Sequence, residues 1–205
     1  RRQRQMCIRD SLYGGQQDNS TIKIASIGSR GGISERDWSA SAGGESAFLA
    51  FNANDPSIVM GGSYLGSVNI YDTKANARKK VMIEPINYIG RAARDMKYRF
   101  NWNFPILFSP HNPKKLYAGS NFLHVSTNSG QSWETISGDL TRNLPETILS
   151  SGGPITQDNT GAEHYANIFA IAESELEEGV IWTGSDDGLI SVSYTHLTLP
   201  TILLV

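Results

Sequence analysis

Apolar and polar residues alternate along this chain in short blocks that favour β-strands joined by tight turns. The clearest block, residues 116–133 (LYAGSNFLHVSTNSGQSW), predicts two strands joined by a compact polar hairpin. Its outline, an apolar run into glycine followed by a polar turn, recurs at residues 58–72 and 180–191, and residues 12–19 keep its first half. The matching glycines stand 47, 57 and 65 residues apart: Gly15, Gly62, Gly119 and Gly184. Such spacing indicates stacked β units.

Each later repeat has a further apolar segment before its glycine strand, at residues 47–51, 105–108 and 168–172. Short apolar runs bounded by turn residues predict strands. Each unit is therefore predicted to contain an inner strand, a glycine-ending second strand, a third strand after a hairpin, and a fourth, outer strand such as residues 133–136. Helical periodicity is nearly absent, and residues 150–160 are predicted to form a loop. We expect an all-β fold: a partial β-propeller of about three to four blades of a larger propeller.

Both ends of the chain resemble translated sequencing adapter. Residues 1–11 (RRQRQMCIRDS) back-translate to the transposase-end primer of tagmentation libraries, and residues 192–201 (VSYTHLTLPT) back-translate to its reverse complement. The alternatives are a basic N-terminal arm and a β-prone C-terminal strand. We treat residues 1–11 and 191–205 as adapter-derived tails without packed contacts, and residues 12–190 as a propeller fragment of a longer protein.

Excluding the tails changes the charge balance. Of 18 basic and 20 acidic residues, the tails hold four arginines and one aspartate, which leaves 14 basic against 19 acidic residues and a net charge of −5. This acidic balance argues against a nucleic-acid partner. The only cysteine, Cys7, lies in the first tail, and the remaining histidines have no metal-ligand spacing, so we expect no disulfide, metal or cofactor. No apolar run approaches the roughly 20 residues that span a bilayer.

The turn at residues 126–133 combines four residue types with separate roles. Asn128 can accept hydrogen bonds from turn amides, Gly130 can adopt a positive φ, and Trp133 can pack the turn against its sheet. With Ser126, these residues resemble the Asp-box of bacterial-neuraminidase-type repeats, Ser-x-Asp-x-Gly-x-x-Trp, in which Asn128 replaces the aspartate. We interpret this turn as a structural element without a catalytic role.

A wider resemblance covers nearly all of residues 12–190. The stretches LYGGQQDN, KYRFNWNFPILFSPHNPKKLYAGSN, ISGDLTRN and VIWTGSDDG resemble bacterial repeat-propeller proteins that carry a sortilin-type domain and are loosely labelled glycosyl hydrolases. The resemblance implies a propeller of seven or more blades in the complete protein, and secretion or export to the periplasm. The hydrolase label in that family follows the fold, so it transfers weakly to this chain.

Three further features have a functional and a structural interpretation, and we favour the structural one for each. The pair Asp186–Asp187 could serve acid–base catalysis, but adjacent strand residues point to opposite sides and Asp-Gly favours a hairpin. The basic and aromatic stretch at residues 91–102 could bind phosphates and bases, but a loop folded over the next blade suits an acidic protein better. His124 is predicted to be half-buried in a strand, and His111 to lie in a surface turn.

The candidate site follows from the repeat register. Glu45 lies 17 residues before Gly62, Trp102 lies 17 before Gly119, and His164 lies 20 before Gly184. All three precede the first strand of a blade, and first strands line the central channel of a propeller. Residues 43–45, 99–103 and 163–165 should therefore converge at one mouth of that channel. The alternative is that they bond neighbouring loops. The candidate ligand-binding residues are Glu45, Arg99, Trp102, Asn103 and His164.

Two classes of function fit such a site. The first is a non-catalytic scaffold that binds a peptide or a glycan at the channel mouth, with the rest of the propeller as its structural partner. The alternative is a glycoside hydrolase, which needs two carboxylates, about 5–5.5 Å apart for retention or 6.5–9.5 Å apart for inversion. Glu45 and Glu163 are the candidate pair for that alternative.

Overall fold

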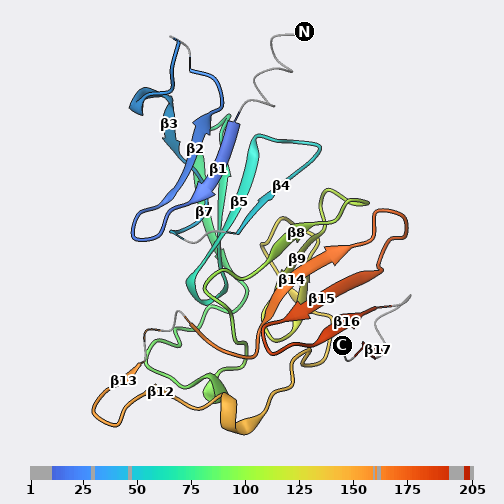
Figure 1. Ribbon diagram of the computed structural model, residues 1–205. Coiled ribbons are helices and arrows are strands. Elements are labelled where there is room, and N and C mark those ends of the chain that lie inside the picture. Colours follow the sequence, from blue (N-terminus) through green and yellow to red (C-terminus); the bar gives the residue numbers. More distant parts are fainter. Residues whose placement is uncertain are drawn as a thin grey trace.

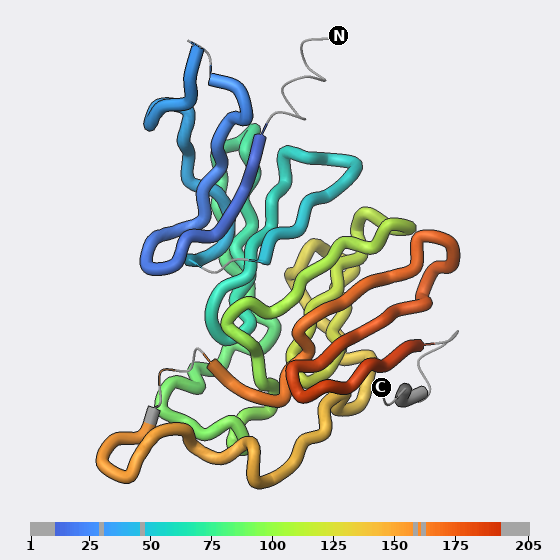
Figure 2. Tube along the Cα trace, viewed as in Figure 1, coloured from blue at the N-terminus to red at the C-terminus, as the bar shows by residue number. Residues whose placement is uncertain are grey.

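The computed structural model describes residues 11–28, 31–45, 48–158, 160, 163–193 and 201–203 (Figures 1 and 2). Within these ranges the protein consists of antiparallel strands, and its helical elements are 3-10 turns of three residues each. The all-β class predicted from the sequence is therefore confirmed. In the part of the chain that is described, no helix is long and apolar enough to cross a membrane.

Four antiparallel sheets follow one another along the chain, and strands that are neighbours in sequence are neighbours in each sheet. Sheet I comprises β1 (Ser11–Gly15), β2 (Thr21–Ala25) and β3 (Trp38–Ala40). Sheet II comprises β4 (Leu49–Phe51), β5 (Ile58–Ser63), β6 (Ser67–Asp72) and β7 (Ala77–Met82). Sheet III comprises β8 (Ile106–Phe108), β9 (Leu116–Gly119), β10 (Leu123–Ser126) and β11 (Glu134–Thr135). Sheet IV comprises β14 (Ile168–Glu173), β15 (Ile181–Ser185), β16 (Ile190–Val192) and β17 (Thr201–Leu203).

Short elements occupy the connections between the sheets. The segment at residues 150–160, predicted as a loop, contains a small hairpin of β12 (Ser151–Gly152) and β13 (Gln157–Asp158). The 3-10 turns are η1 (Glu35–Asp37), η2 (Tyr64–Gly66), η3 (Ala93–Asp95) and η4 (Pro145–Thr147).

The glycine repeat predicted from the sequence marks equivalent strands. Gly15 ends β1, Gly119 ends β9, and Gly62 and Gly184 lie near the ends of β5 and β15. In sheets II, III and IV the predicted inner strand, β4, β8 or β14, pairs with the glycine strand as expected.

Sheets II, III and IV pack face to face, and their first strands approach one another, β4 against β8 and β14 against β8 and β9. One apolar cluster lies between sheets II and III and joins Met60 and Val68 to Ile106 and Leu116. A second cluster lies between sheets III and IV and includes Tyr117, Leu123, Ile168 and Ile181. In Figure 1 the sheets appear in sequence order, from sheet I in blue to sheet IV in red.

The repeated glycine allows the next sheet to approach closely. A Cβ atom at Gly62 would lie 3.1 Å from the ring of Phe104, two residues before the start of β8. At Gly119 it would lie 2.9 Å from Ile168, the first residue of sheet IV. A larger residue at either position would push against these side chains, so each glycine lets an apolar residue of the following repeat approach closely.

In sheets I and II the residue directly before the repeated glycine is also a glycine, Gly14 or Gly61. Substitutions at these two positions can therefore be compared. A Cβ at Gly61 would lie 2.6 Å from both the Ala42 carbonyl oxygen and the Gly43 Cα, whereas Gly14, the same position of sheet I, has nothing within 4 Å. Because backbone atoms cannot rotate away, Gly61→Ala is expected to lower the free energy of unfolding by about 1–3 kcal/mol. Gly14→Ala should change it by no more than about 0.5 kcal/mol. Urea unfolding of both variants measures the difference, and equal effects would show that the close contact of residues 42–43 with Gly61 does not limit the size of the residue there.

Residues at the two predicted tail boundaries pair with neighbouring strands. Ser11 belongs to β1, where it pairs with Ala25, and Val192 belongs to β16, where it pairs with Trp182 and is buried. Beyond it, β17 pairs with the free edge of β16. The predicted absence of packing is therefore wrong for Val192. The reason is physical, because an open strand edge pairs with any backbone that can reach it.

Candidate functional site

In sheets II, III and IV the end of the glycine strand contacts a segment that leads into a first strand, at one edge of each sheet. In sheet II the Gly44 amide donates to the Gly62 carbonyl oxygen at 3.1 Å. Between sheets III and IV the Ile168 amide donates to the Ser120 carbonyl oxygen at 2.7 Å, and in sheet IV the Asp186 amide donates to that of Asn167 at 3.0 Å. We call this edge the rim, and it comprises residues 43–45, 62–64, 101–105, 119–121, 163–167 and 184–186.

Three of the candidate residues occupy equivalent positions on the rim. Glu45, Trp102 and His164 each lie four residues before the first residue of their inner strands, which begin at Leu49, Ile106 and Ile168. The repeat register inferred from the sequence is thus confirmed at the level of the strands.

Glu45 and Trp102 are brought together by Tyr64, a residue that sequence analysis did not identify. The Tyr64 hydroxyl donates to Glu45 Oε1, and the amide of Asp18 donates to Glu45 Oε2 at 2.5 Å. The rings of Tyr64 and Trp102 are stacked, with centroids 6.0 Å apart and planes 9° apart. A carboxylate and two aromatic rings thus form one cluster on the rim, to which the exposed Asn103 is adjacent in sequence.

Arg99 lies beneath the rim and is held by protein groups. Its side chain is buried, and Nη2 donates to Asp139 Oδ2 at 2.9 Å and to Thr141 Oγ1 at 3.1 Å. Its Nε donates to the Ala166 carbonyl oxygen at 3.0 Å, and its amide donates to Asn121 Oδ1 at 2.9 Å. Arg99 therefore joins the segments that lead into sheets III and IV, which is the role of a positioning residue.

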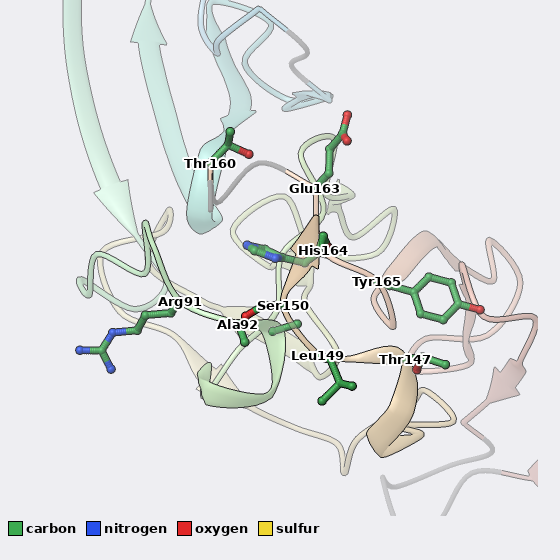
Figure 3. Close-up of a pocket in the computed structure, with 11 residues that line it drawn as sticks. Arg91, Ala92, Thr147, Leu149, Ser150, Thr160, Glu163, His164 and Tyr165 are labelled. Carbon is green, nitrogen blue, oxygen red and sulfur yellow. The ribbon is translucent and has the colours of Figure 1, made fainter. Parts of the chain in front are cut away.

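Glu163 and His164 line a different hollow, of about 380 Å³ including open solvent, between residues 91–93 and 147–151 (Figure 3). The backbone carbonyl of His164 accepts a hydrogen bond from Asn167 Nδ2. Figure 3 shows the side chains of Arg91, Glu163 and Tyr165 pointing in three different directions. The six candidates therefore separate into the Glu45–Trp102 cluster with Asn103 beside it, the buried Arg99, and the Glu163–His164 hollow.

A short sequence signal could have found the residues that were missed. Each later glycine is followed by serine, and the next residue lies on the rim: Tyr64, Asn121 and Asp186. Asn121 is buried and contacts both Arg99 and Asp139. Asp186 accepts the amide of Asn167 at 2.8 Å, and burial raises the pKa of its carboxyl group above the usual range.

The Asp186–Asp187–Gly188 segment forms the hairpin turn expected from its sequence. Gly188 has a positive φ, and its amide donates to the Ser185 carbonyl oxygen at 3.1 Å. Asp187 accepts hydrogen bonds from the Arg142 amide and the Ser185 hydroxyl. The two carboxylates thus hold different segments of backbone, which supports the structural interpretation.

The turn at residues 126–133 has the local geometry expected from its residue types. Asn128 Oδ1 accepts the Ser132 amide at 2.9 Å, and Ser126 Oγ accepts the Gly130 amide at 2.8 Å. Gly130 has a φ of 78°, and the Trp133 indole donates to its carbonyl oxygen at 3.1 Å. Trp133 packs against the cluster between sheets II and III, so the turn serves packing.

His124 is more deeply buried than predicted, at 1% exposure. Its Nε2 lies 2.8 Å from the Ser120 hydroxyl and its Nδ1 3.1 Å from the Thr135 hydroxyl. Burial, followed by the nearby charge of Lys97, lowers the pKa of His124 to about 4. The neighbouring Tyr98 and Phe100 rings pack around it, so these aromatic residues of the basic stretch belong to the core.

No group of three or more histidine, cysteine or acidic side chains in the described ranges is arranged to hold a metal ion. No protein-family model matches the chain, and no curated protein does.

Proposed function

We propose that this chain is part of an exported β-propeller and that its rim binds a polar ligand, a peptide or a glycan, without catalysing a reaction. The propeller proposal is supported by four successive antiparallel sheets, and by Gly62 and Gly119, which face the first residues of the following repeat. It is also supported by the contacts among the first strands β4, β8 and β14, as expected if these strands surround a common axis.

The observation that carries the binding proposal is the cluster of Glu45, Tyr64 and Trp102. Tyr64 is 36% exposed, so its ring and the stacked Trp102 offer apolar surface at the rim. Aromatic faces beside fixed hydrogen-bonding groups suit a sugar ring or an extended peptide, because both have apolar surfaces flanked by donors. The bonds from Tyr64 and Asp18 hold the Glu45 carboxylate in place before any ligand arrives.

The same contacts give the hydrolase alternative less support. Both oxygens of Glu45 already accept hydrogen bonds, and Glu163 lines the separate hollow beside residues 147–151. A glycosidase needs its two carboxylates to face one glycosidic bond across about 5–10 Å. Binding needs only the Glu45 cluster.

The test uses hexose oligosaccharides and unstructured peptides as probes, titrated into the chain by calorimetry. Trp102→Ala should weaken binding of the probe that associates with the wild type by roughly 30-fold, or about 2 kcal/mol, as for a central aromatic contact. Tyr64→Phe keeps the ring but removes the bond to Glu45, and it should have a smaller effect.

Trp38→Ala is the matched control, because Trp38 is also an accessible tryptophan but lies outside the rim. The proposal fails if Trp102→Ala and Trp38→Ala bind equally well, or if no probe binds. Glycan cleavage that disappears in the Glu45→Gln, Glu163→Gln double variant would instead establish the hydrolase.

A further inference from the structure

The last strand of sheet II has one edge to which no strand of the described residues pairs. In the order of that sheet β7 stands at the end, beside β6. It is six residues long, whereas the last strands of the other three sheets, β3, β11 and β17, have two or three residues. Sheet II stands between sheets I and III in the chain, so an end of the sequence does not create this edge. We call it the open edge of β7.

The backbone groups on the open edge belong to Arg78 and Lys80. The Ile83 amide donates to the Gly66 carbonyl oxygen at 3.3 Å, which extends the ladder between β6 and β7 by one pair. Hydrogen-bonded pairs alternate along an antiparallel ladder, so every second residue before Ile83 bonds to β6. The residues between them, Arg78 and Lys80, direct their N–H and C=O groups to the other side. Unpaired groups of this kind allow an extended peptide to add to a sheet.

The same strand is basic, although the chain as a whole is acidic. Residues 67–82 hold four basic residues against one acidic residue, in a chain with a net charge of −2. Arg78, Lys79 and Lys80 are exposed, and no acidic side chain of the described residues forms an ion pair with them. Within this part of the protein, three consecutive positive charges therefore lack a countercharge.

Lys79 and Lys80 project from opposite faces of sheet II. Lys79 pairs with Ile70, which packs against the apolar cluster between sheets II and III, whereas Lys80 pairs with Asn69 on the other face. Side chains of an added strand alternate between the faces in the same way. A partner strand therefore needs two consecutive acidic residues to place one carboxylate beside each lysine.

The strand is held in place before any partner is added. The Arg78 guanidinium donates to the carbonyl oxygens of Ala40 at 3.0 Å and Ser41 at 2.6 Å, and lies 4.0 Å from the centre of the Tyr71 ring. In the preceding hairpin, the Tyr71 hydroxyl donates to Asn76 Oδ1 at 3.0 Å. Arg78 thus joins the strand to residues 40–41, which leaves the two lysines to meet a ligand. A preformed edge loses little conformational freedom on binding.

We propose that the open edge of β7 binds an extended peptide segment with two consecutive acidic residues, which adds to sheet II as a fifth strand. The backbone of this segment bonds to Arg78 and Lys80, and its carboxylates lie beside Lys79 and Lys80. Lysines also protect an exposed edge from pairing with apolar strands. Here the same charges select a strand of opposite charge. The site is at the opposite side of sheet II from its inner strand, and it does not depend on what the rim binds.

The probe is a capped, fluorescently labelled hexapeptide of sequence TVEEVT, titrated into the chain at low salt and followed by fluorescence anisotropy. The wild type should bind it. Lys79→Glu and Lys80→Glu should each weaken binding by roughly tenfold, because each turns an attraction into a repulsion. Lys114→Glu is the matched control, an exposed lysine outside sheet II, and it should bind as the wild type does. Circular dichroism checks that each variant is folded.

Two measurements separate strand addition from simple attraction of charge. Two further peptides keep both carboxylates but are N-methylated on either the odd or the even backbone amides. One form should bind about tenfold more weakly and the other like the parent, because only every second amide of an added strand faces β7. Hydrogen exchange at the Arg78 and Lys80 amides should slow by about tenfold or more with the parent peptide, while the Lys79 amide, which bonds to β6, should change little.

Three results would overturn the proposal. If the acidic peptide does not bind, the lysines serve only to protect the edge. If both lysine variants bind it as tightly as the wild type, the peptide attaches elsewhere. If both methylated forms bind like the parent, the basic strand attracts polyanions in general and no ladder is formed.

Discussion

Arg99→Ala is expected to lower the free energy of unfolding by about 3–5 kcal/mol, as when one partner of a buried ion pair is removed. Arg99 is buried, and its guanidinium joins Asp139 and Thr141 to the Ala166 carbonyl group. Without it, the mostly buried Asp139 carboxylate loses its countercharge and keeps only neutral donors. Urea denaturation followed by circular dichroism measures the loss.

Two variants separate this role from a general effect of removing positive charge. Arg94→Ala removes an exposed arginine beside Asp95 and should change stability by less than about 1 kcal/mol. Arg99→Lys restores the charge but not the planar fork that reaches three acceptors, so it should recover only part of the loss. A cost below about 1 kcal/mol for Arg99→Ala would show that Asp139 is hydrated well enough to need no partner.

The same substitution bears on the candidate site. The position of Arg99 before the inner strand of sheet III predicted it to be a ligand-binding residue. In the structure, however, its side-chain nitrogens donate hydrogen bonds to protein acceptors that lie 40 to 67 residues further along the chain. Any loss of ligand binding in Arg99→Ala should therefore follow the loss of folded protein, whereas Trp102→Ala should weaken binding without it.

The repeat could be read from the sequence because it rests on local signals. A strand that ends in glycine before a polar turn can be recognised within about ten residues. The spacing of the glycines then aligns one repeat with the next. This is why the inner strands β4, β8 and β14, and the equivalent positions of Glu45, Trp102 and His164, follow from spacing alone.

The side-chain contacts of these residues could not be predicted in this way. Tyr64 reaches Glu45 because η2 turns the chain back over the rim, with Leu65 at a φ of 58°. Glu163 and Glu45 stand near equivalent positions, but the connections before their strands differ in length and course, so their side chains enter different surroundings. Spacing fixes the strand on which a residue lies, and the connecting segments decide what it touches.

Acidification is expected to destabilise the fold between about pH 6.5 and pH 4 through His124. Burial and the charge of Lys97 lower the pKa of His124 to about 4 in the folded protein, against about 6.5 in an unfolded chain. The unfolded chain therefore binds a proton in this window that the folded protein excludes, so stability falls as the pH falls. The slope reaches about 1.4 kcal/mol per pH unit, and this contribution is constant above about pH 7 and below about pH 4.

Comparison with His124→Gln isolates this effect from that of other groups. Asp186 acts in the opposite direction, since its raised pKa makes the folded protein bind a proton more readily as the pH falls, but it contributes equally to both proteins. His124→Gln should lose the slope between pH 6.5 and 4, whereas the exposed His111→Gln should keep it. Denaturant midpoints at half-unit pH steps provide the measurement. If His124→Gln keeps the wild-type slope, protonated His124 must be accommodated inside the folded protein, and the hydroxyls of Ser120 and Thr135 would then be accepting its protons.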